Sequence, residues 1–295
     1  MNNQMKGVLF ALIATLLWSV NMVIASGVKD HIPPIGLAFW RWTIACIVFA
    51  PFALKNTIGD FAIVKRHFGY LIITAIFGIS IFNTLIYFAG QTTSAINLSL
   101  MAISIPLFII AISRIVFKEK VSTTKMVGIA IIIMGVLILI TKGSLQALIN
   151  INFTSGDLLM LLACLFFACY TILVRKKPAA LDSKVFLFSV FIIGTLLLLP
   201  FYIFEHVNYN QVTFDSKTIL ITSYVGIFAS LVCFYLWNEA ISLIGTSKTA
   251  VIYYLIPIFS GIIAYFFLGQ AIGLIQIISM TIIVLGLLLT NKKAA

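Results

Sequence analysis

The chain has 295 residues, of which 62% are hydrophobic and 9% are charged. Because about a quarter of the residues in soluble domains are charged, this composition excludes a water-soluble globule and predicts that most of the surface faces lipid. A net charge of +11 would indicate a nucleic-acid partner for a soluble protein. Here the positions of the basic residues indicate membrane topology instead.

Ten apolar segments are each long enough to cross a bilayer as an α-helix, because a hydrocarbon core of roughly 30 Å needs about 20 residues. Helices also satisfy their backbone hydrogen bonds within one segment, as lipid requires. The predicted segments are Gly7–Ala25, Pro34–Leu54, Gly69–Ala89, Thr93–Phe117, Thr123–Thr141, Gly156–Val174, Val185–Phe204, Thr218–Asn238, Thr249–Leu268 and Ile272–Thr290. The predicted fold class is therefore an all-α integral membrane protein with ten transmembrane helices.

The basic residues predict how these helices are oriented. If the N-terminus is cytoplasmic, most of the 19 basic residues lie on the inner side, and Lys29, Lys142 and Lys217 lie outside. Positive charge gathers in cytoplasmic loops, and an even number of helices returns the C-terminus to the same side. We therefore predict a multi-pass protein of the bacterial inner (plasma) membrane with both termini in the cytoplasm.

The sequence offers no metal, cofactor or nucleotide site. The 4 cysteines lie inside apolar segments, and the 3 histidines lie in separate connections, so they cannot form a metal cluster at plausible spacing. The sequence also contains no P-loop and no GxGxxG run. The predicted partners are a small-molecule substrate and membrane lipid, with no ATPase subunit and no nucleic acid implied.

An internal repeat divides the chain into two halves. Ile105, Pro106 and Gly135 recur as Ile256, Pro257 and Gly286 at one constant offset. The predicted domains are a first repeat at 1–141, an outer connection at 142–155 and a second repeat at 156–295. Because five helices is an odd number, the second repeat would enter the membrane with opposite polarity, which is the inverted arrangement of many secondary transporters.

Two stretches carry a family resemblance. The run SAINLSLMAISIPLFIIAISRIVFKEKVSTTKMVGIAIIIMGV (94–136) and the run GDLLMLLACLFFACYTILVRK (156–176) resemble the signature stretches of EamA-like members of the drug/metabolite transporter (DMT) superfamily. Within that group the chain is similar to exporters of aromatic amino acids and metabolites. The resemblance implies a central cavity between the two halves, with the fifth and tenth helices peripheral. The chain departs from the pattern at Gln270, where an acid matching Glu119 is usual.

Polar residues inside the apolar segments mark a candidate substrate site, because they are costly in hydrocarbon unless paired or hydrated. Counting along the helices places Asn21, Arg41 and Asn83 in one outer layer, with Ser99 near the same depth. A guanidinium flanked by amides is a plausible clamp for a carboxylate or phosphate. The alternative is that Arg41 reaches the outer headgroups between two tryptophans.

Aromatic residues form the rest of the predicted cavity wall. The proposed contacts are Trp18, Tyr87, Tyr170, Trp237, Tyr253 and Tyr254, some of which could instead pack between helices or in the interfacial belt. Pro106 and Pro257 are predicted to kink their helices and to act as points of bending. Glu239 is a possible coupling residue, although its predicted depth near the cytoplasmic interface favours simple solvation.

These observations predict a secondary transporter that exports a small amphipathic metabolite, most of all amino acids, by alternating access. Facilitated diffusion is preferred over proton coupling, because no carboxylate is predicted near the membrane midplane. A proton-coupled exporter of drugs or organic cations would need an acid in the first helix, which has none. A membrane enzyme acting on lipid headgroups would need clustered acids or histidines, and a scaffold would have no reason to bury Arg41.

Overall fold

The computed structural model describes residues 2–27, 32–93, 98, 101–141, 143–144, 146, 149, 154–209, 212–268 and 273–291. Within these ranges the chain forms helices and no strand. The helical elements are α1 (Asn3–Gly27), α2 (Pro34–Gly59), α3 (Phe61–Arg66), α4 (Phe68–Ala75), η1 (Ile76–Ile81), α5 (Phe82–Thr92), α7 (Ser104–Phe117), α8 (Thr123–Thr141), α10 (Ser155–Arg175), α11 (Ser183–Asn208), α12 (Ser216–Tyr224), η2 (Val225–Val232), α13 (Cys233–Ile244), α14 (Thr246–Ile252), η3 (Tyr253–Leu255), α15 (Ile256–Leu268) and α16 (Leu274–Asn291).

Long apolar helices make this a multi-pass membrane protein. Within the described ranges, 7 helices are long and apolar enough to cross a bilayer. They coincide with the predicted first to third and sixth to ninth segments. Shorter apolar helices lie at the predicted fourth, fifth and tenth segments, at Ser104–Phe117, Thr123–Leu139 and Ile277–Thr290. The all-helical membrane fold is confirmed, and the number of ten crossings stays a prediction.

Several predicted segments differ from the helices observed. The third and eighth each contain a π-helical turn, η1 and η2, and the ninth is interrupted by the 3₁₀ turn η3. Apolar composition does not reveal such changes, because they alter the hydrogen-bond register and not the hydropathy. The second helix continues to Gly59 instead of ending at Leu54.

Helix starts are fixed by local capping and by one contact between helices. Asp182 accepts a hydrogen bond from the backbone nitrogen of Lys184 at 2.8 Å at the start of α11. At the start of α2, the buried carboxylate of Glu205 on α11 accepts the N–H groups of Ile35 at 3.1 Å and Gly36 at 2.6 Å. Glu205 therefore caps a helix that lies far away in the sequence.

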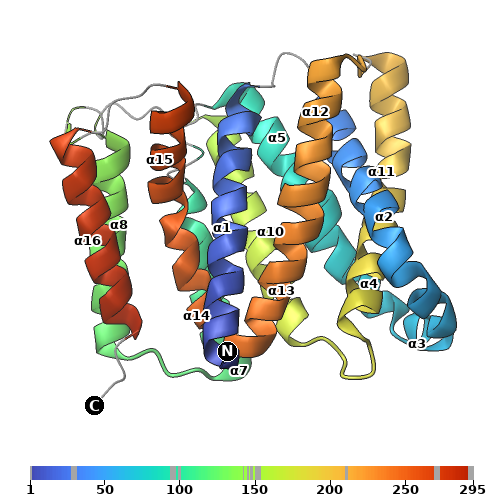
Figure 1. Cartoon of the computed structure of the whole chain (residues 1–295), viewed down its shortest axis with the longest axis horizontal. Helices are drawn as coiled ribbons and strands as arrows, with labels where there is room; N and C mark the ends of the chain where they lie inside the picture. Colours follow the sequence, from blue (N-terminus) through green and yellow to red (C-terminus); the bar gives the residue numbers. More distant parts are fainter. Residues whose placement is uncertain are drawn as a thin grey trace.

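The helices pack into one bundle whose centre is aromatic. Figure 1 shows α8 and α16 side by side at one edge, with α2 and α11 toward the other edge. Between them α1 packs against α13 and α15. The start of α1 and the end of α16 lie at the same end of the bundle. The core is rich in buried rings, including Trp18, Trp42, Phe167, Phe234 and Trp237.

Candidate functional site

Arg41 lies at the centre of a buried polar cluster. Its side chain is 1% exposed, and its Nε donates to Ser230 Oγ at 2.8 Å. One terminal nitrogen donates to Asn83 Oδ1 at 2.8 Å and to Tyr87 Oη at 2.6 Å. The other donates to the carbonyl of Ala229 at 3.3 Å. The structure therefore brings together three predicted residues from α2 and α5, and it adds η2 from the second half of the chain.

The charge of Arg41 has no acidic partner among the residues that the structure describes. The hydrogen bonds go to hydroxyl, amide and carbonyl oxygens, and the nearest ring, Trp42, has its centroid 5.1 Å from the guanidinium carbon. Because the side chain is buried, Arg41 does not take the alternative conformation that would reach toward the headgroups. A buried charge without a counter-ion is costly, so this cluster is the strongest candidate for binding an anionic group.

The two π-helical turns position the partners of Arg41. Ser230 lies within η2 and donates to the carbonyl of Val225 at 2.8 Å, a spacing of five residues. Asn83 follows η1, and its amide nitrogen donates to the carbonyl of Gly78 at 3.4 Å. A π-helical turn carries one residue more than an α-helical turn and is frequent at functional sites. η2 therefore supplies Ser230 and the Ala229 carbonyl to the guanidinium, and η1 precedes the helix that supplies Asn83.

A layer of packed rings fills the bundle beside the Arg41 cluster. The ring of Trp18 lies 5.6 Å from Phe167, 5.9 Å from Phe234, 5.2 Å from Trp237 and 6.0 Å from Tyr253, measured between centroids. The indole nitrogen of Trp18 donates to the carbonyl of Ala229 at 2.9 Å, the same carbonyl that Arg41 contacts. The indole of Trp18 and the guanidinium of Arg41 are therefore held by the same backbone carbonyl.

The remaining predicted contacts are placed differently. Tyr170 is buried and donates to Asn238 Oδ1 at 2.9 Å, and its ring covers Gly78, where an added Cβ would lie 2.1 Å from a ring carbon. Tyr254 belongs to a separate apolar cluster with residues of α8 and α16, so it does not join Tyr253. Asn21 is 8% exposed. Ser99 lies outside the described residues.

Pro106 and Pro257 do not lie in the middle of continuous helices. Pro106 is in the first turn of α7, which begins at Ser104, and Pro257 is in the first turn of α15, directly after η3. A proline is tolerated there because the first turn has no intrahelical partner for its missing N–H. The turn residue Ile103 before α7 and the 3₁₀ turn η3 before α15 interrupt the helices ahead of the two prolines, and bending at the prolines stays a prediction.

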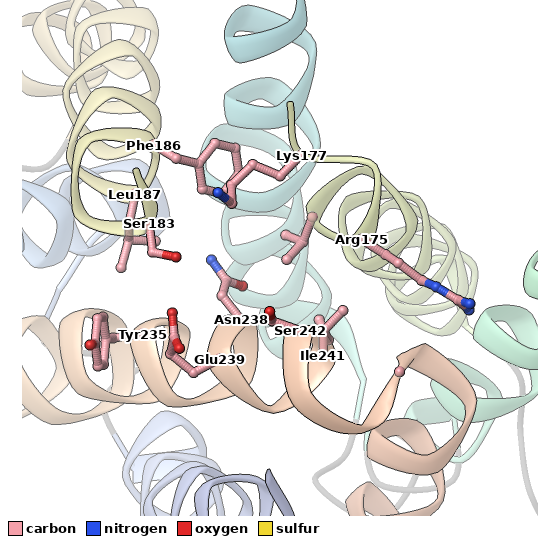
Figure 2. Close-up of a pocket in the computed structure, with 12 residues that line it drawn as sticks. Arg175, Lys177, Ser183, Phe186, Leu187, Tyr235, Asn238, Glu239, Ile241 and Ser242 are labelled. Atoms are coloured by element: carbon pink, nitrogen blue, oxygen red, sulfur yellow. The ribbon is translucent and has the colours of Figure 1, made fainter. Parts of the chain in front are cut away.

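A cavity of about 450 Å³ opens near the end of the bundle that carries the last turn of α10 (Figure 2). We call this end of the bundle, which is predicted to face the cytoplasm, the inner end. The cavity is lined by Val174, Arg175, Lys177, Ser183, Phe186, Leu187, Tyr235, Asn238, Glu239, Ile241, Ser242 and Gly245. Glu239, which the sequence placed near the cytoplasmic interface, lines this cavity, whereas the predicted substrate-binding residues do not. Tyr170 connects the aromatic layer to it through Asn238.

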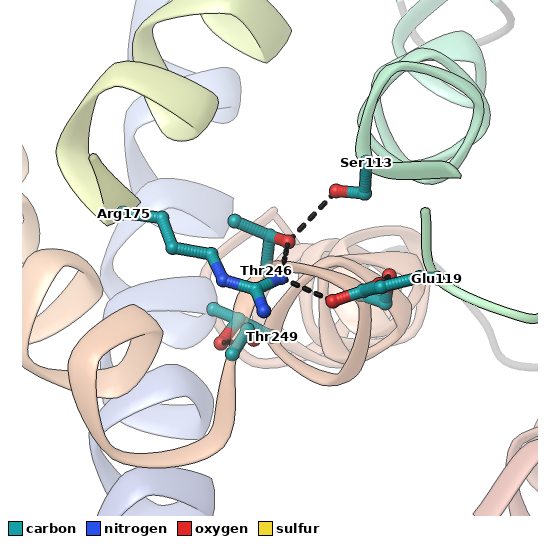
Figure 3. Close-up of polar contacts among 7 residues, drawn as sticks. Ser113, Glu119, Arg175, Thr246 and Thr249 are labelled. Atoms are coloured by element: carbon teal, nitrogen blue, oxygen red, sulfur yellow. Dashed lines mark hydrogen bonds and ion pairs between the residues drawn. The ribbon is translucent and has the colours of Figure 1, made fainter. Parts of the chain in front are cut away.

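A second polar cluster joins the two halves at the inner end (Figure 3). Arg175 forms an ion pair with Glu119 and donates to Thr246 Oγ1 at 3.2 Å, and Ser247 donates to the other oxygen of Glu119. Thr246 also lies 2.8 Å from Ser113 Oγ. Partial burial raises the pKa of Glu119, but the hydrogen bonds from Ser247 and Arg175 outweigh it and lower the pKa below its ordinary value.

Sequence reasoning missed Ser230, Asn238 and Arg175, as well as the hydroxyl residues of the second cluster, Ser113, Thr246 and Ser247. Asn238 follows Phe234 by four positions on α13, which is a usable signal, whereas Ser230 lies in the π-helical turn η2, where that spacing does not define one face. Arg175 is one of three consecutive basic residues, and nothing in the sequence separates it from its neighbours Lys176 and Lys177. Its pairing with Glu119 depends on the tertiary fold.

A bundle of long apolar helices that buries an arginine without an acidic partner among the described residues, with a polar cavity at its inner end, is typical of a membrane transport protein rather than a soluble enzyme. The family described as "EamA-like transporter family" matches the chain twice, at residues 5–141 and 154–292. The chain therefore belongs to the EamA-like transporter family of the DMT superfamily, and its substrate is a small molecule.

Individual relatives are also transporters. The chain is 26% identical over 231 residues to an "Uncharacterized transporter" of Archaeoglobus fulgidus, covering 77% of each protein. It is 26% identical over 243 residues to a "Probable amino-acid metabolite efflux pump" of Salmonella typhimurium, covering 78% of this chain and 76% of that protein. A solved crystal structure matches 97% of this chain and 96% of its own with a TM-score of 0.76 at 18% identity, which shows a shared fold.

Proposed function

We propose that this transporter exports small amphipathic organic metabolites, amino acids foremost, across the bacterial inner membrane by alternating access. The observation that carries the proposal is the buried guanidinium of Arg41, which has neutral hydrogen-bond partners and no carboxylate in the described structure. A substrate carboxylate would supply the missing negative charge. The planar fork of a guanidinium suits that group better than any other side chain does.

The adjoining aromatic layer supports an amphipathic substrate. Trp18 donates to the Ala229 carbonyl that also accepts from Arg41, and the rings of Phe167 and Trp237 pack against Trp18. A substrate with a charged end and an apolar end would find a cation and ring faces side by side. The name of the Salmonella typhimurium relative points to the same substrate class.

Corresponding elements in the two halves support a duplicated bundle of ten helices. α2 and α11 each have 26 residues, and η1 and η2 occur at matching places before α5 and α13. An added Cβ on Gly135 would meet Ile283, and one on Gly286 would meet Ile132. This reciprocal contact is what a two-fold axis between α8 and α16 would produce. We therefore propose inverted repeats at 1–141 and 156–295, with both termini cytoplasmic.

The Glu119–Arg175 cluster is suited to act as an inner gate. Glu119 follows α7 in the first repeat, whereas Arg175 and Ser247 belong to the second. Movement of the end of α7 away from α10 and α14 would break these contacts, and the interruptions before Pro106 and Pro257 would let α7 and α15 bend. We propose facilitated transport, because no carboxylate of the described residues accompanies Arg41 and Glu239 lies at the inner cavity.

Uptake into proteoliposomes tests this function. Purified protein would be reconstituted and supplied with labelled L-phenylalanine, L-leucine, a nucleoside and an organic cation, each with and without a pH gradient. We expect saturable flux of the amino acids that does not depend on the gradient. Flux of the cation alone would contradict the proposed substrate class. Flux that requires the gradient and persists in Glu239→Gln would contradict facilitation and exclude Glu239 as the coupling group.

A further inference from the structure

The inner cavity contains charged and polar groups that the Arg41 cluster does not use. We propose that it is a separate entry site for zwitterionic α-amino acids, in which Glu239 binds the ammonium group while Lys177 and Asn238 bind the carboxylate. This inference rests on the proposed export of amino acids and assigns the site where they are first bound. The substrate would be selected here before it reaches Arg41.

The polar side chains of the cavity converge from two helices. In Figure 2 the carboxylate of Glu239, the amide of Asn238 and the hydroxyl of Ser183 point into the same space, and Lys177 approaches it from the opposite wall. The ammonium of Lys177 donates to the carbonyl of Leu181, which holds it at the cavity. A lysine has three donors, so others stay available for a ligand.

Glu239 is an acid without an ion pair in the described part of the chain. Arg175 also lines the cavity, but its guanidinium points away toward Glu119 (Figures 2 and 3). The carboxylate of Glu239 therefore faces the cavity with its charge uncompensated. An amino-acid ammonium group is a cation of matching size and hydrogen-bonding capacity.

The amide of Asn238 is a further indication, independent of Glu239, that the cavity binds a ligand. Its oxygen accepts a hydrogen bond from Tyr170 at 2.9 Å, which fixes the amide orientation and turns the nitrogen away from the tyrosine. That nitrogen is buried and has no hydrogen-bond partner. An unsatisfied buried donor destabilises the protein, and a carboxylate oxygen would satisfy it.

The size and walls of the cavity suit an amphipathic amino acid. Its volume of about 450 Å³ lies within the range of roughly 300–1,000 Å³ that is usual for small-molecule sites. Phe186, Leu187 and Ile241 supply apolar surface beside the charged groups. A zwitterion with an aromatic or branched side chain would match both parts of the lining.

Transport measured from one side tests this site. Inside-out membrane vesicles expose the inner end, and uptake of labelled L-phenylalanine would be measured for wild type, Glu239→Gln and Lys177→Gln. We expect the KM for substrate offered at the inner end to rise at least tenfold in both variants, whereas the KM for substrate offered at the outer end in right-side-out vesicles should change little. Lys184→Gln is the matched control, because Lys184 is exposed on α11 and lies outside the cavity.

Substrate analogues separate the two charged contacts. Competition by 3-phenylpropionate, which lacks the ammonium group, should be unchanged in Glu239→Gln. Competition by phenethylamine, which lacks the carboxylate, should be unchanged in Lys177→Gln. Glu239→Asp keeps the charge and should retain part of the affinity, which separates ligand binding from a folding defect. Unchanged KM in both neutral variants of a protein that transports L-phenylalanine would overturn the entry site and leave the proposed function standing.

Direct binding separates this proposal from the proposed function. If wild-type protein does not transport L-phenylalanine, amino-acid export is refuted, and binding of labelled L-phenylalanine to detergent-purified protein then decides the entry site. Binding that is lost in Glu239→Gln and Lys177→Gln would support the site. Absence of binding to wild type would overturn it.

Discussion

Arg41 and Arg175 belong to the same residue type but occupy two different environments. Arg41 is 1% exposed and is held by neutral groups from two elements, α5 and η2. The side chain of Arg175 is 31% exposed and pairs with Glu119 at the inner end. Within the described part of the chain, Arg41 is buried without an acidic partner, whereas Arg175 has one and is accessible to water.

The difference teaches what each contact can do in a transport cycle. Exposed ion pairs contribute about 0–1 kcal/mol, so the Glu119–Arg175 contact can form and break without a large change in stability. Loss of a buried charged partner costs about 2–5 kcal/mol. The binding free energy from a substrate carboxylate that pairs with Arg41 is therefore larger than the free energy needed to break the Glu119–Arg175 ion pair.

The largest expected effect comes from removing the buried guanidinium. Arg41→Ala should lower the kcat/KM for amino acids by at least a hundredfold, because about 3 kcal/mol or more of carboxylate binding is lost. Arg41→Lys should retain part of the activity, since it keeps the charge but loses the fork. Uptake into proteoliposomes checks this prediction, with size-exclusion chromatography to confirm folded protein. Wild-type flux in Arg41→Ala would remove Arg41 from the substrate site.

The second largest effect is expected on stability, where the ring of Tyr170 packs against Gly78. An added methyl group in Gly78→Ala would overlap the ring of Tyr170, since the Cβ would lie 2.1 Å from a ring carbon. We expect a loss of about 1–3 kcal/mol in stability, measured as a lower Tm. Gly59→Ala is the control, because nothing lies within 4 Å of an added Cβ there. Equal Tm values for the two variants would show that Tyr170 can move aside freely.

A smaller effect is expected at the inner end. Glu119→Gln should cost at most about 1 kcal/mol of stability but change the transport rate severalfold if the cluster is a gate. A double-mutant cycle with Arg175→Gln measures the coupling between the two side chains, and Lys118→Gln controls for charge at this loop. Additive effects on the rate would mean that the pair does not act as one unit.

The smallest effect is a dependence on pH. The pKa of Glu119 is lowered in the folded protein, so its contribution is present above the ordinary pKa of a glutamate and is lost as pH falls through the lower folded value. Tm should therefore be insensitive to this group near neutral pH and fall at acid pH. The difference in Tm between wild type and Glu119→Gln should shrink as the pH is lowered. A difference that grows on acidification would contradict this assignment.

Sequence alone could predict the membrane fold, because hydropathy and helix length determine it directly. It also placed Asn21, Arg41 and Asn83 at one level, since depth follows from counting residues along a helix. In the structure, Arg41 donates hydrogen bonds to Asn83 and to Tyr87. Ser230 was missed because it comes from a distant π-helical turn, and depth counting does not identify a partner across the bundle.

The inner cavity could not be predicted for a related reason. Its lining combines the end of α10, the start of α11 and the middle of α13, and the sequence does not reveal which faces of these helices meet. Tyr254 shows the same limit, because adjacent tyrosines in η3 point into separate clusters. Residue type indicated the chemistry, and tertiary packing decided the location.

The cap that Glu205 provides constrains how the molecule can move. Because α11 satisfies the first backbone donors of α2, these helices are fastened together although they come from different repeats. A pivoting body composed solely of one repeat would have to expose two amide protons to hydrocarbon. The mobile units are therefore expected to be mixed helix pairs, and spin labels near the outer ends of α2 and α11 should keep a fixed separation throughout turnover.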